Sequence, residues 1–387
     1  MTMTPRERVL TALAHEEPDR VPIVLGVSNA TGLKMKPYRE LTQLLGIDAP
    51  ERYLYEWPEL GTADPDGATL VRLGTDVRGV WDLEPAGVLD RNAARPPGTY
   101  YLNSWGSGAS QVSPDEWFPS VCPMAAATTI EEIEDYPWPD MDDPTRVAHV
   151  AADAARLAAE GRYAIMATPW LLFPLERSFV MQGMDVFLMN LVFYPEFAQA
   201  LLWKIQSLCK QLMGHFLEAL GPSVDIIKIG DDLGTQDSLM MSPDMYRAVL
   251  KPIHADYIRF IKERTDAKVF FHTDGDVFDL IEDFIEMGVD ILNPIQTSAG
   301  KMANLEELKA RWGDRLTFCG GIDTQRILPR GTPDQVRAEV GRVIEVLASG
   351  GGYMVSSVHT VMNDVPAANV LAMVDAVQEY GTYPLPG

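Results

Sequence analysis

Apolar runs rich in β-branched and aromatic residues alternate along this chain with stretches of helical periodicity, and several of the runs end in polar side chains. We expect strands at residues 21–25, 75–80, 163–167, 224–229, 268–272, 289–292, 316–319 and 353–358. Helical patterns such as 243–263, 277–287, 305–312 and 332–349 separate the later runs. Strands joined through helices pair in parallel, and eight such strands close a (β/α)8 TIM barrel. An open, doubly wound sheet is the alternative.

The length of the chain suits one elaborated domain. It has 387 residues, and α/β barrels with insertions often exceed about 250 residues as a single unit. We therefore assign residues 1–387 to one domain. Between about 81 and 160, glycines and prolines interrupt the periodic patterns. This predicts a long, irregular insertion after the second strand, and insertions of that length are usually functional or cap a site.

The charge balance argues against two classes of partner. Thirty-two basic residues stand against 55 acidic ones, which gives a formal net charge of −23 and disfavours binding to nucleic acid or to an anionic membrane. No apolar run approaches the roughly 18–20 residues of a membrane span, and the first residues lack the apolar core of a signal peptide. The 3 cysteines are dispersed and form no disulfide framework. We expect a cytoplasmic protein.

Candidate metal ligands stand at the ends of the later strands. His272 and Asp274 are two positions apart at the end of one run, so both face the same side of that strand. Cys319 ends another run, and His359 follows the last one. Because the carboxyl ends of barrel strands meet at one face, these side chains could converge. Imidazole, carboxylate and thiolate together suit a catalytic zinc. A capped strand end with a hydrogen-bonded histidine, and a small buried cysteine, are the structural alternatives.

Further polar residues follow the apolar runs and are candidates for catalysis or substrate binding. Asp231 and Asp232 come directly after the strongly apolar run 224–229, and one of two adjacent carboxylates can have a raised pKa that suits a general acid or base. Capping of the helix that begins near Ser242-Pro243-Asp244 is the alternative for this pair. Asn293 and Gln296 offer amides that could hold a substrate or bond within their loop, and Asp323 stands at the next strand end.

Several segments together resemble the uroporphyrinogen decarboxylase superfamily, which includes corrinoid- and thiol-dependent methyltransferases. The resemblance covers nearly the whole chain and implies a TIM barrel. The segments that carry it are Arg6-Glu7-Arg8-Val9, Pro18-Asp19-Arg20-Val21-Pro22, Leu73-Gly74-Thr75-Asp76, Gly183-Met184, His272-Thr273-Asp274-Gly275-Asp276, Gly320-Gly321-Ile322-Asp323-Thr324-Gln325 and Gly351-Gly352-Tyr353.

Two departures from the family patterns decide which branch the chain resembles. The porphyrinogen decarboxylases have an arginine-containing segment after the first strand that binds substrate carboxylates, whereas residues 26–32 here contain no arginine. The methyltransferase branch has His-x-Cys on one strand and a cysteine near the last. Here His272 matches the histidine, Asp274 replaces the first cysteine and His359 falls near the second. A site with fewer thiolates is harder and suits oxygen or nitrogen substrates better than thiols.

The resemblance therefore implies a zinc-dependent methyltransferase that demethylates a small methoxylated or methylated compound. Zinc would be held by His272, Asp274 and His359, with Cys319 as a further candidate. Asp231 or Asp232 would protonate or orient the leaving group, and Asn293, Gln296 and Asp323 would position the substrate.

The methyl acceptor in this reading is cobalamin, a corrinoid. The sequence contains no Asp-x-His-x-x-Gly signature, so a separate corrinoid protein would carry it. The resemblance also implies a homodimer.

Two other classes of function stay open on the sequence. One is a metal-independent decarboxylase or lyase of a small carboxylic acid, with Asp76 or Asp232 as the catalytic carboxylate and His272 as a structural residue. The other is a binding protein that keeps the barrel without catalysis. Metal content separates the methyltransferase from the metal-independent enzyme.

Overall fold

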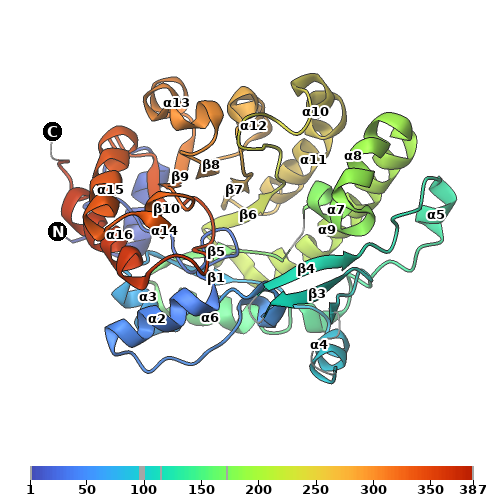
Figure 1. Ribbon diagram of the computed structural model, residues 1–387, viewed down its shortest axis with the longest axis horizontal. Helices are drawn as coiled ribbons and strands as arrows, with labels where there is room; N and C mark the ends of the chain where they lie inside the picture. Colours follow the sequence, from blue (N-terminus) through green and yellow to red (C-terminus); the bar gives the residue numbers. More distant parts are fainter. Residues whose placement is uncertain (1, 96–100, 114–115, 171–172, 386–387) are drawn as a thin grey trace.

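The computed structural model of the protein describes residues 2–95, 101–113, 116–170 and 173–385. Seven parallel strands form one curled sheet in the order β1-β5-β6-β7-β8-β9-β10 (Figure 1). Their bounds are β1 Val77–Val80, β5 Ala164–Ala167, β6 Ile226–Gly230, β7 Lys268–His272, β8 Ile291–Ile295, β9 Thr317–Ile322 and β10 Tyr353–Ser357. The α/β class and the parallel pairing are as predicted.

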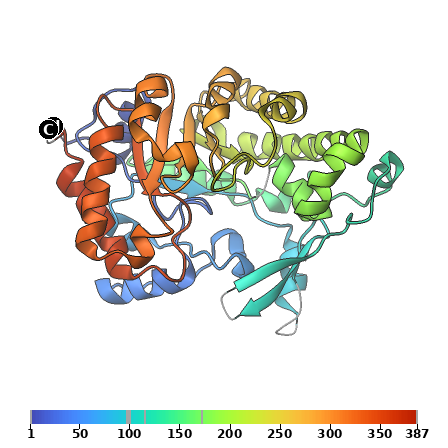
Figure 2. The same cartoon turned by 45° about the horizontal axis from the view of Figure 1, so that its top comes forward.

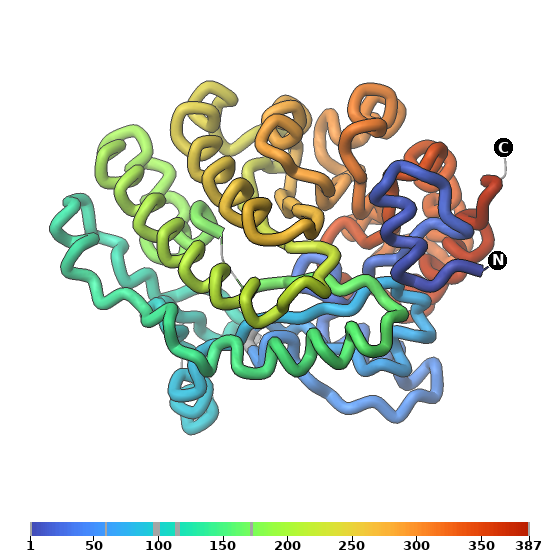
Figure 3. Tube along the Cα trace, turned by 180° about the vertical axis from the view of Figure 1, so that it is seen from behind, coloured from blue at the N-terminus to red at the C-terminus, as the bar shows by residue number. Residues whose placement is uncertain are grey.

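Helices surround the outer face of this sheet, and the two chain ends lie near each other (Figure 3). The α-helices are α1 Pro5–Leu13, α2 Met35–Leu45, α3 Gly67–Arg72, α4 Ala86–Ala93, α5 Ile130–Glu134, α6 Val150–Glu160, α7 Pro174–Gln182, α8 Met184–Phe193, α9 Pro195–Leu220, α10 Pro243–Val249, α11 Lys251–Lys262, α12 Ile281–Met287, α13 Leu305–Trp312, α14 Ile327–Arg330, α15 Pro333–Leu347 and α16 Ala367–Tyr380. Short 3-10 helices are η1 Leu54–Glu56, η2 Pro58–Leu60, η3 Pro144–Arg146, η4 Gly221–Ser223, η5 Phe278–Leu280 and η6 Gly300–Ala303. In the described residues, no helix is both long and apolar enough to span a bilayer.

An apolar layer fills the inside of the curled sheet. Each of the seven strands contributes an inward side chain to one buried cluster, and Val24 from the first predicted strand joins it. Val9 and Leu13 of α1 belong to the same cluster, so this helix covers the amino-terminal end of the strands. The interior is a packed core rather than a channel, which leaves the carboxyl ends of the strands as the functional face.

The predicted strand at 21–25 is not a regular strand, although it lies where a strand would. It makes one parallel bridge, between Ile23 and Val355 of β10. The Val24 N–H donates to the Val355 carbonyl at 2.9 Å, and the Asp76 N–H donates to the Ile23 carbonyl at 2.9 Å. The segment thus lies between the two edges of the sheet. Pro22 has no N–H to donate to a neighbouring strand, so the segment makes one bridge and not a continuous ladder.

The stretch 81–160 is more regular than its sequence suggested. It contains α4 and α6 and a small antiparallel sheet of β2 Tyr101–Leu102, β3 Gly108–Ser113 and β4 Glu116–Val121. This sheet projects away from the helices around the barrel strands (Figure 2). Residues 96–100 and 114–115 of the predicted insertion lie outside the described residues. The predicted helix 243–263 is divided into α10 and α11 next to Pro252, since proline removes a helical hydrogen bond.

A buried ion-pair network joins α1, segment 21–25 and β1. The Asp76 carboxylate lies next to both Arg8 and Arg20, at 2.5 Å and 3.0 Å between the charged atoms, and 1 % of its side chain is exposed. Its Oδ2 also accepts the Ile23 N–H at 2.7 Å. Asp76 precedes β1 and therefore lies at the amino-terminal end of the sheet. The candidate site lies at the carboxyl ends of the strands, the opposite end of the sheet. Asp76 is therefore too far from it to act as the catalytic carboxylate, and that hypothesis is wrong.

We expect the substitution Asp76→Asn to destabilise the fold strongly. Removing the shared carboxylate leaves the buried Arg20 without its ion-pair partner and Arg8 with Asp19 alone, and loss of one partner of a buried pair costs about 3–5 kcal/mol. The free energy of unfolding in urea measures the loss. The control is Asp375→Asn, because Asp375 pairs with Arg72 at 3.5 Å with both side chains well exposed, and such surface pairs contribute about 0–1 kcal/mol. Equal losses in the two variants would contradict a structural role of the Asp76 network.

Candidate metal centre

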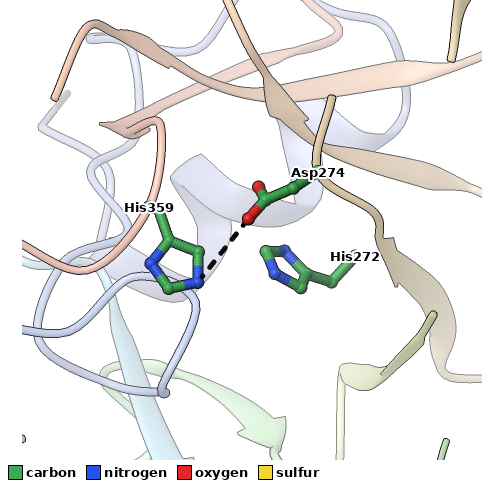
Figure 4. Close-up of side chains that lie close together, drawn as sticks. All are labelled: His272, Asp274 and His359. Atoms are coloured by element: carbon green, nitrogen blue, oxygen red, sulfur yellow. Dashed lines mark ion pairs between the residues drawn. The ribbon is translucent and has the colours of Figure 1, made fainter. Parts of the chain in front are cut away.

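Three predicted ligands meet at the carboxyl ends of the strands. His272 is the last residue of β7, Asp274 follows it in the loop, and His359 follows β10. One ligand atom from each lies within 4.8 Å of the other two. His359 Nε2 and Asp274 Oδ2 are 3.9 Å apart, and Figure 4 shows the side chains pointing toward one another. Residues far apart in the sequence thus form a compact group of two imidazoles and one carboxylate.

A hydrogen bond to Asn293 of β8 fixes the orientation of the His272 ring. His272 Nδ1 lies 2.7 Å from Asn293 Oδ1, and Asn293 Nδ2 donates to the Cys319 carbonyl at 3.3 Å. Because the amide nitrogen is committed to a carbonyl, the amide oxygen must accept, so His272 Nδ1 carries the proton. Nε2 is then left with its lone pair. A hydrogen bond of this kind on the far ring nitrogen is typical of histidines that bind metals.

Burial shifts all three candidate ligands toward their neutral forms. Burial and then the positive charge of Lys228 hold the pKa of His272 well below its usual value, and the same two causes lower the pKa of His359. Burial and then the Asp232 carboxylate raise the pKa of Asp274 well above its usual value. Asp274 Oδ1 is buried without a hydrogen-bond partner among the described residues. Neutral imidazoles and an unsatisfied carboxylate oxygen are what a cation would bind.

Cys319 is not part of this group. Its side chain is fully buried and belongs to the apolar layer inside the sheet, together with Phe270, Ile291 and Met354. Burial raises the pKa of the thiol to about 12, so a thiolate is strongly disfavoured there. Cys319 lies in the same apolar layer as Phe270, two residues before His272 on β7, which agrees with the alternative of a small buried cysteine. The prediction of Cys319 as a metal ligand is therefore not supported by its place in the fold.

The two adjacent aspartates have different environments. Asp231 accepts the Leu175 and Glu176 N–H groups of the first turn of α7, at 3.0 and 2.8 Å, and pairs with His254 Nε2 at 2.9 Å. It therefore caps α7, and not the helix near Ser242 that the capping alternative named, which has Ser242 itself as its N-cap. Asp232 Oδ1 accepts the Asp274 N–H at 2.8 Å. Burial raises the pKa of Asp232, so of the two it is the group suited to carry a proton.

The predicted substrate-binding residues mostly support the loops of the site. Gln296 Oε1 accepts the Gly275 N–H at 2.7 Å and so holds the loop that carries Asp274. Asn293 orients His272, as described above. Asp323 follows β9, and its Oδ1 accepts the Gln325 N–H at 2.7 Å. All three residues therefore hold strand ends or loops of the site in place through hydrogen bonds. A direct contact with a substrate stays a prediction.

Two charged residues of the site, Lys228 and Glu176, were not predicted from the sequence. Lys228 lies inside the apolar run that became β6 and is fully buried. Glu176 lies in the first turn of α7 beside Asp232, and burial followed by repulsion from Asp232 raises its pKa well above the usual value. A lysine at an inward position of an otherwise apolar strand was the available signal for Lys228. The sequence offered no comparable signal for Glu176, because its helix reads as ordinary.

We expect Asn293→Leu to weaken zinc binding by about 10–100-fold, because His272 would lose the acceptor that fixes its tautomer. Asn293→Asp keeps an acceptor for His272 Nδ1 and should stay close to the wild-type affinity. Competition with a chromophoric zinc chelator measures both. The control is Asn190→Leu, since Asn190 is also buried but bonds to Gln182 on α7. Wild-type zinc affinity in Asn293→Leu would show that His272 needs no such support.

Comparisons with known proteins agree with this fold. In solved structures, the chain is similar to a methyltransferase from Methanosarcina mazei, with a TM-score of 0.69, 18% identity and coverage of 98% of this chain and 99% of that one; this likeness establishes the fold. Among curated proteins it is 24% identical over 261 residues to a uroporphyrinogen decarboxylase of Pseudomonas syringae pv. tomato, covering 65% of this chain and 69% of that protein.

A second curated relative is a uroporphyrinogen decarboxylase of Legionella pneumophila, 26% identical over 194 residues, which are 50% of this chain and 51% of that protein. The family profile for uroporphyrinogen decarboxylase (URO-D) matches residues 115–380. That range includes all three residues of the candidate metal centre and most of the curled sheet. The chain belongs to the uroporphyrinogen decarboxylase family.

Proposed function

We propose that the protein is a zinc-dependent methyltransferase that moves a methyl group from a small methoxylated or methylated substrate to a corrinoid carried by a separate protein. The observation that carries the proposal is the group of His272, Asp274 and His359 at the carboxyl ends of the strands. In α/β barrels this is the catalytic face. Segment 21–25 takes the place of an eighth strand between the two edges of the sheet. We therefore take the architecture as a (β/α)8 barrel in which 81–160 is an insertion.

The three side chains fit a zinc ion. Ligand atoms around tetrahedral zinc lie roughly 3.3 Å apart, given bonds of about 2.0–2.1 Å. The atoms here lie within 4.8 Å of one another, so modest side-chain movements would complete the site. Three protein ligands leave a position open, as in catalytic rather than structural zinc sites. When bound, zinc would polarise the oxygen or nitrogen that carries the methyl group and stabilise the leaving alkoxide or phenolate.

The other residues of the site prepare the leaving group and keep the ligands in place. Asp232 lies against the backbone of Asp274 and beside Glu176, so a protonated Asp232 Oδ2 could give its proton to the departing oxygen or nitrogen. Asp231 keeps α7, and with it Glu176, in position. Asn293 keeps the Nε2 lone pair of His272 free of a proton. Each of these roles uses a contact that the described residues already make.

The acceptor must reach the open side of the site. Of the ligand side chains, 39% of His359 and 30% of Asp274 are exposed to solvent, so the group is accessible from outside. The chain carries no cobalamin signature of its own, and the proposal therefore assigns the corrinoid to a partner. The overall change is that the substrate loses its methyl group as a methyl cation equivalent and gains one proton, while Co(I) is alkylated.

A metal-independent decarboxylase or lyase of a small acid is the second candidate. The observation that favours it is the raised pKa of Asp232, which burial causes, because a carboxyl group that keeps its proton can protonate a carbanion after loss of CO2. In that case His272 and His359 would be structural. The two candidates differ in their need for a metal.

Metal analysis distinguishes the candidates first. We expect about one zinc per chain in untagged wild-type protein by ICP-MS, and loss of the metal in the double variant His272→Ala/His359→Ala, because a zinc site cannot lose two of three protein ligands. His215→Ala is the control, since His215 lies apart and pairs with Asp142. Two histidines and a carboxylate also suit Fe(II). Iron in place of zinc would therefore correct the identity of the metal in the proposal and keep its ligands. No metal in the wild type would refute the proposal and favour the decarboxylase.

We expect Asp232→Asn to lower demethylation by about 10²–10⁴-fold, the usual contribution of a positioned general acid, while the zinc content stays at the wild-type level. Formation of methylcobalamin from Co(I) cobalamin and a methoxylated aromatic substrate, followed by absorbance, measures the rate. Asp237→Asn, in the exposed part of the same loop, is the control and should keep full activity. Unchanged activity in Asp232→Asn would assign the proton to another group.

A further inference from the structure

The ammonium group of Lys228 is buried inside the functional face. Lys228 lies on β6 and is 0% exposed. Buried lysines are normally paired with an anion, because an isolated ammonium is costly to remove from water. Burial lowers the pKa of Lys228 to about 8, so the group still carries its proton at neutral pH. The molecule thus keeps a positive charge inside its functional face.

The charges of Glu176, Asp232 and Asp274 act on this group and raise its pKa, but the described residues hold no direct ion-pair partner for it. Lys228 Nζ donates to the amide oxygen of Asn29 at 3.0 Å and lies 4.5 Å from the ring centroid of Phe173. Neither partner carries a negative charge. Lys228 forms no ion pair within 4.0 Å among the described residues, whereas the neighbouring His359 and Asp274 do pair. An ammonium has three N–H donors, so Lys228 has donors left for a further acceptor.

Lys228 lies next to the candidate metal centre. Gly230 of β6 is the register partner of His272, and Lys228 is two positions earlier on the same inward face. After burial, its positive charge is the next cause that lowers the pKa of both His272 and His359. Asn29, which holds it, is partly exposed. Lys228 and His272 therefore lie on neighbouring strands, and the residue that accepts the hydrogen bond of the ammonium borders solvent.

We infer that Lys228 is an anion-binding residue, and that the substrate is a methylated compound which also carries a carboxylate. This inference rests on the proposed function. The carboxylate would accept hydrogen bonds from Lys228 Nζ and complete its missing pairing, while the methylated oxygen or nitrogen faces His272, Asp274 and His359. Asn29 would act as the residue that positions the ammonium. A divalent cation beside Lys228 adds positive charge to the same face and strengthens the preference for an anion.

Binding of a matched pair of probes tests the inference without methyl transfer. The probes are 4-methoxybenzoate and the neutral 4-methoxybenzyl alcohol, titrated by calorimetry into the protein as purified, with sodium acetate as a third ligand. A charge-assisted hydrogen bond should make 4-methoxybenzoate bind at least about tenfold more tightly than the alcohol. Acetate should bind more weakly than 4-methoxybenzoate. Equal affinities for the two methoxy compounds would overturn the inference, and acetate binding as tightly as 4-methoxybenzoate would overturn the substrate class.

Substitution of the lysine identifies the residue responsible. Lys228→Met keeps the length and the apolar stem and removes the charge, and it should abolish the difference between the two methoxy compounds while the metal content stays unchanged. Lys36→Met, at an exposed position of α2, should keep the difference. Persistence of the preference in folded Lys228→Met would overturn the assignment. A selective but metal-free protein would refute the proposed function alone, and a metal-containing protein without selectivity would refute this inference alone.

Discussion

The functional face depends on how the two edges of the parallel sheet are joined at Asp76. An open parallel sheet has unpaired N–H and C=O groups at both edges, and here segment 21–25 bonds to β10 on one side and to Asp76 on the other. The Asp76 carboxylate accepts the Ile23 N–H as a backbone carbonyl would. Arg8 and Arg20 compensate its charge. This closure brings the loop after β10, with His359, back toward the loop after β7, with His272.

The sequence was sufficient for the fold where the signal is local. The runs at 268–272 and 305–312 were predicted at the bounds that β7 and α13 have. The first is a short continuous apolar run and the second has helical periodicity, and both signals are local. Segment 21–25 has the composition of a strand, but Pro22 and the charged network decide its pairing, and both act through residues far away in the sequence. The small sheet of β2, β3 and β4 was missed because its strands are short and partly polar.

The ligand residues of the candidate site could be predicted from the sequence, but how deep each side chain lies below the carboxyl ends of the strands could not. His272, Asp274 and His359 follow from the rule that barrel strands end at one face. Cys319 was predicted as a ligand but lies one layer below the site, in the apolar core. The sequence shows which strand Cys319 belongs to, but not where along that strand the apolar core ends. Lys228 was not predicted as a site residue, because it stands in the otherwise apolar run Ile226 to Ile229, which indicates a buried strand. Only the inward register of β6 shows that its charge faces the site.

The strong acidity of the chain and an anionic substrate are compatible, because the two charges act over different distances. The net charge of −23 belongs largely to exposed side chains, whose field is screened beyond about 8 Å at physiological ionic strength. Lys228 acts inside the protein, where the effective dielectric constant is lower and an interaction at hydrogen-bond distance is several times stronger than in bulk water. The carboxyl groups nearest to it, Glu176, Asp232 and Asp274, have raised pKa values and so oppose an incoming anion less than their number suggests. Long-range repulsion would slow the approach of an anion, whereas its affinity once bound would be set by the lysine and the cation-binding side chains beside it.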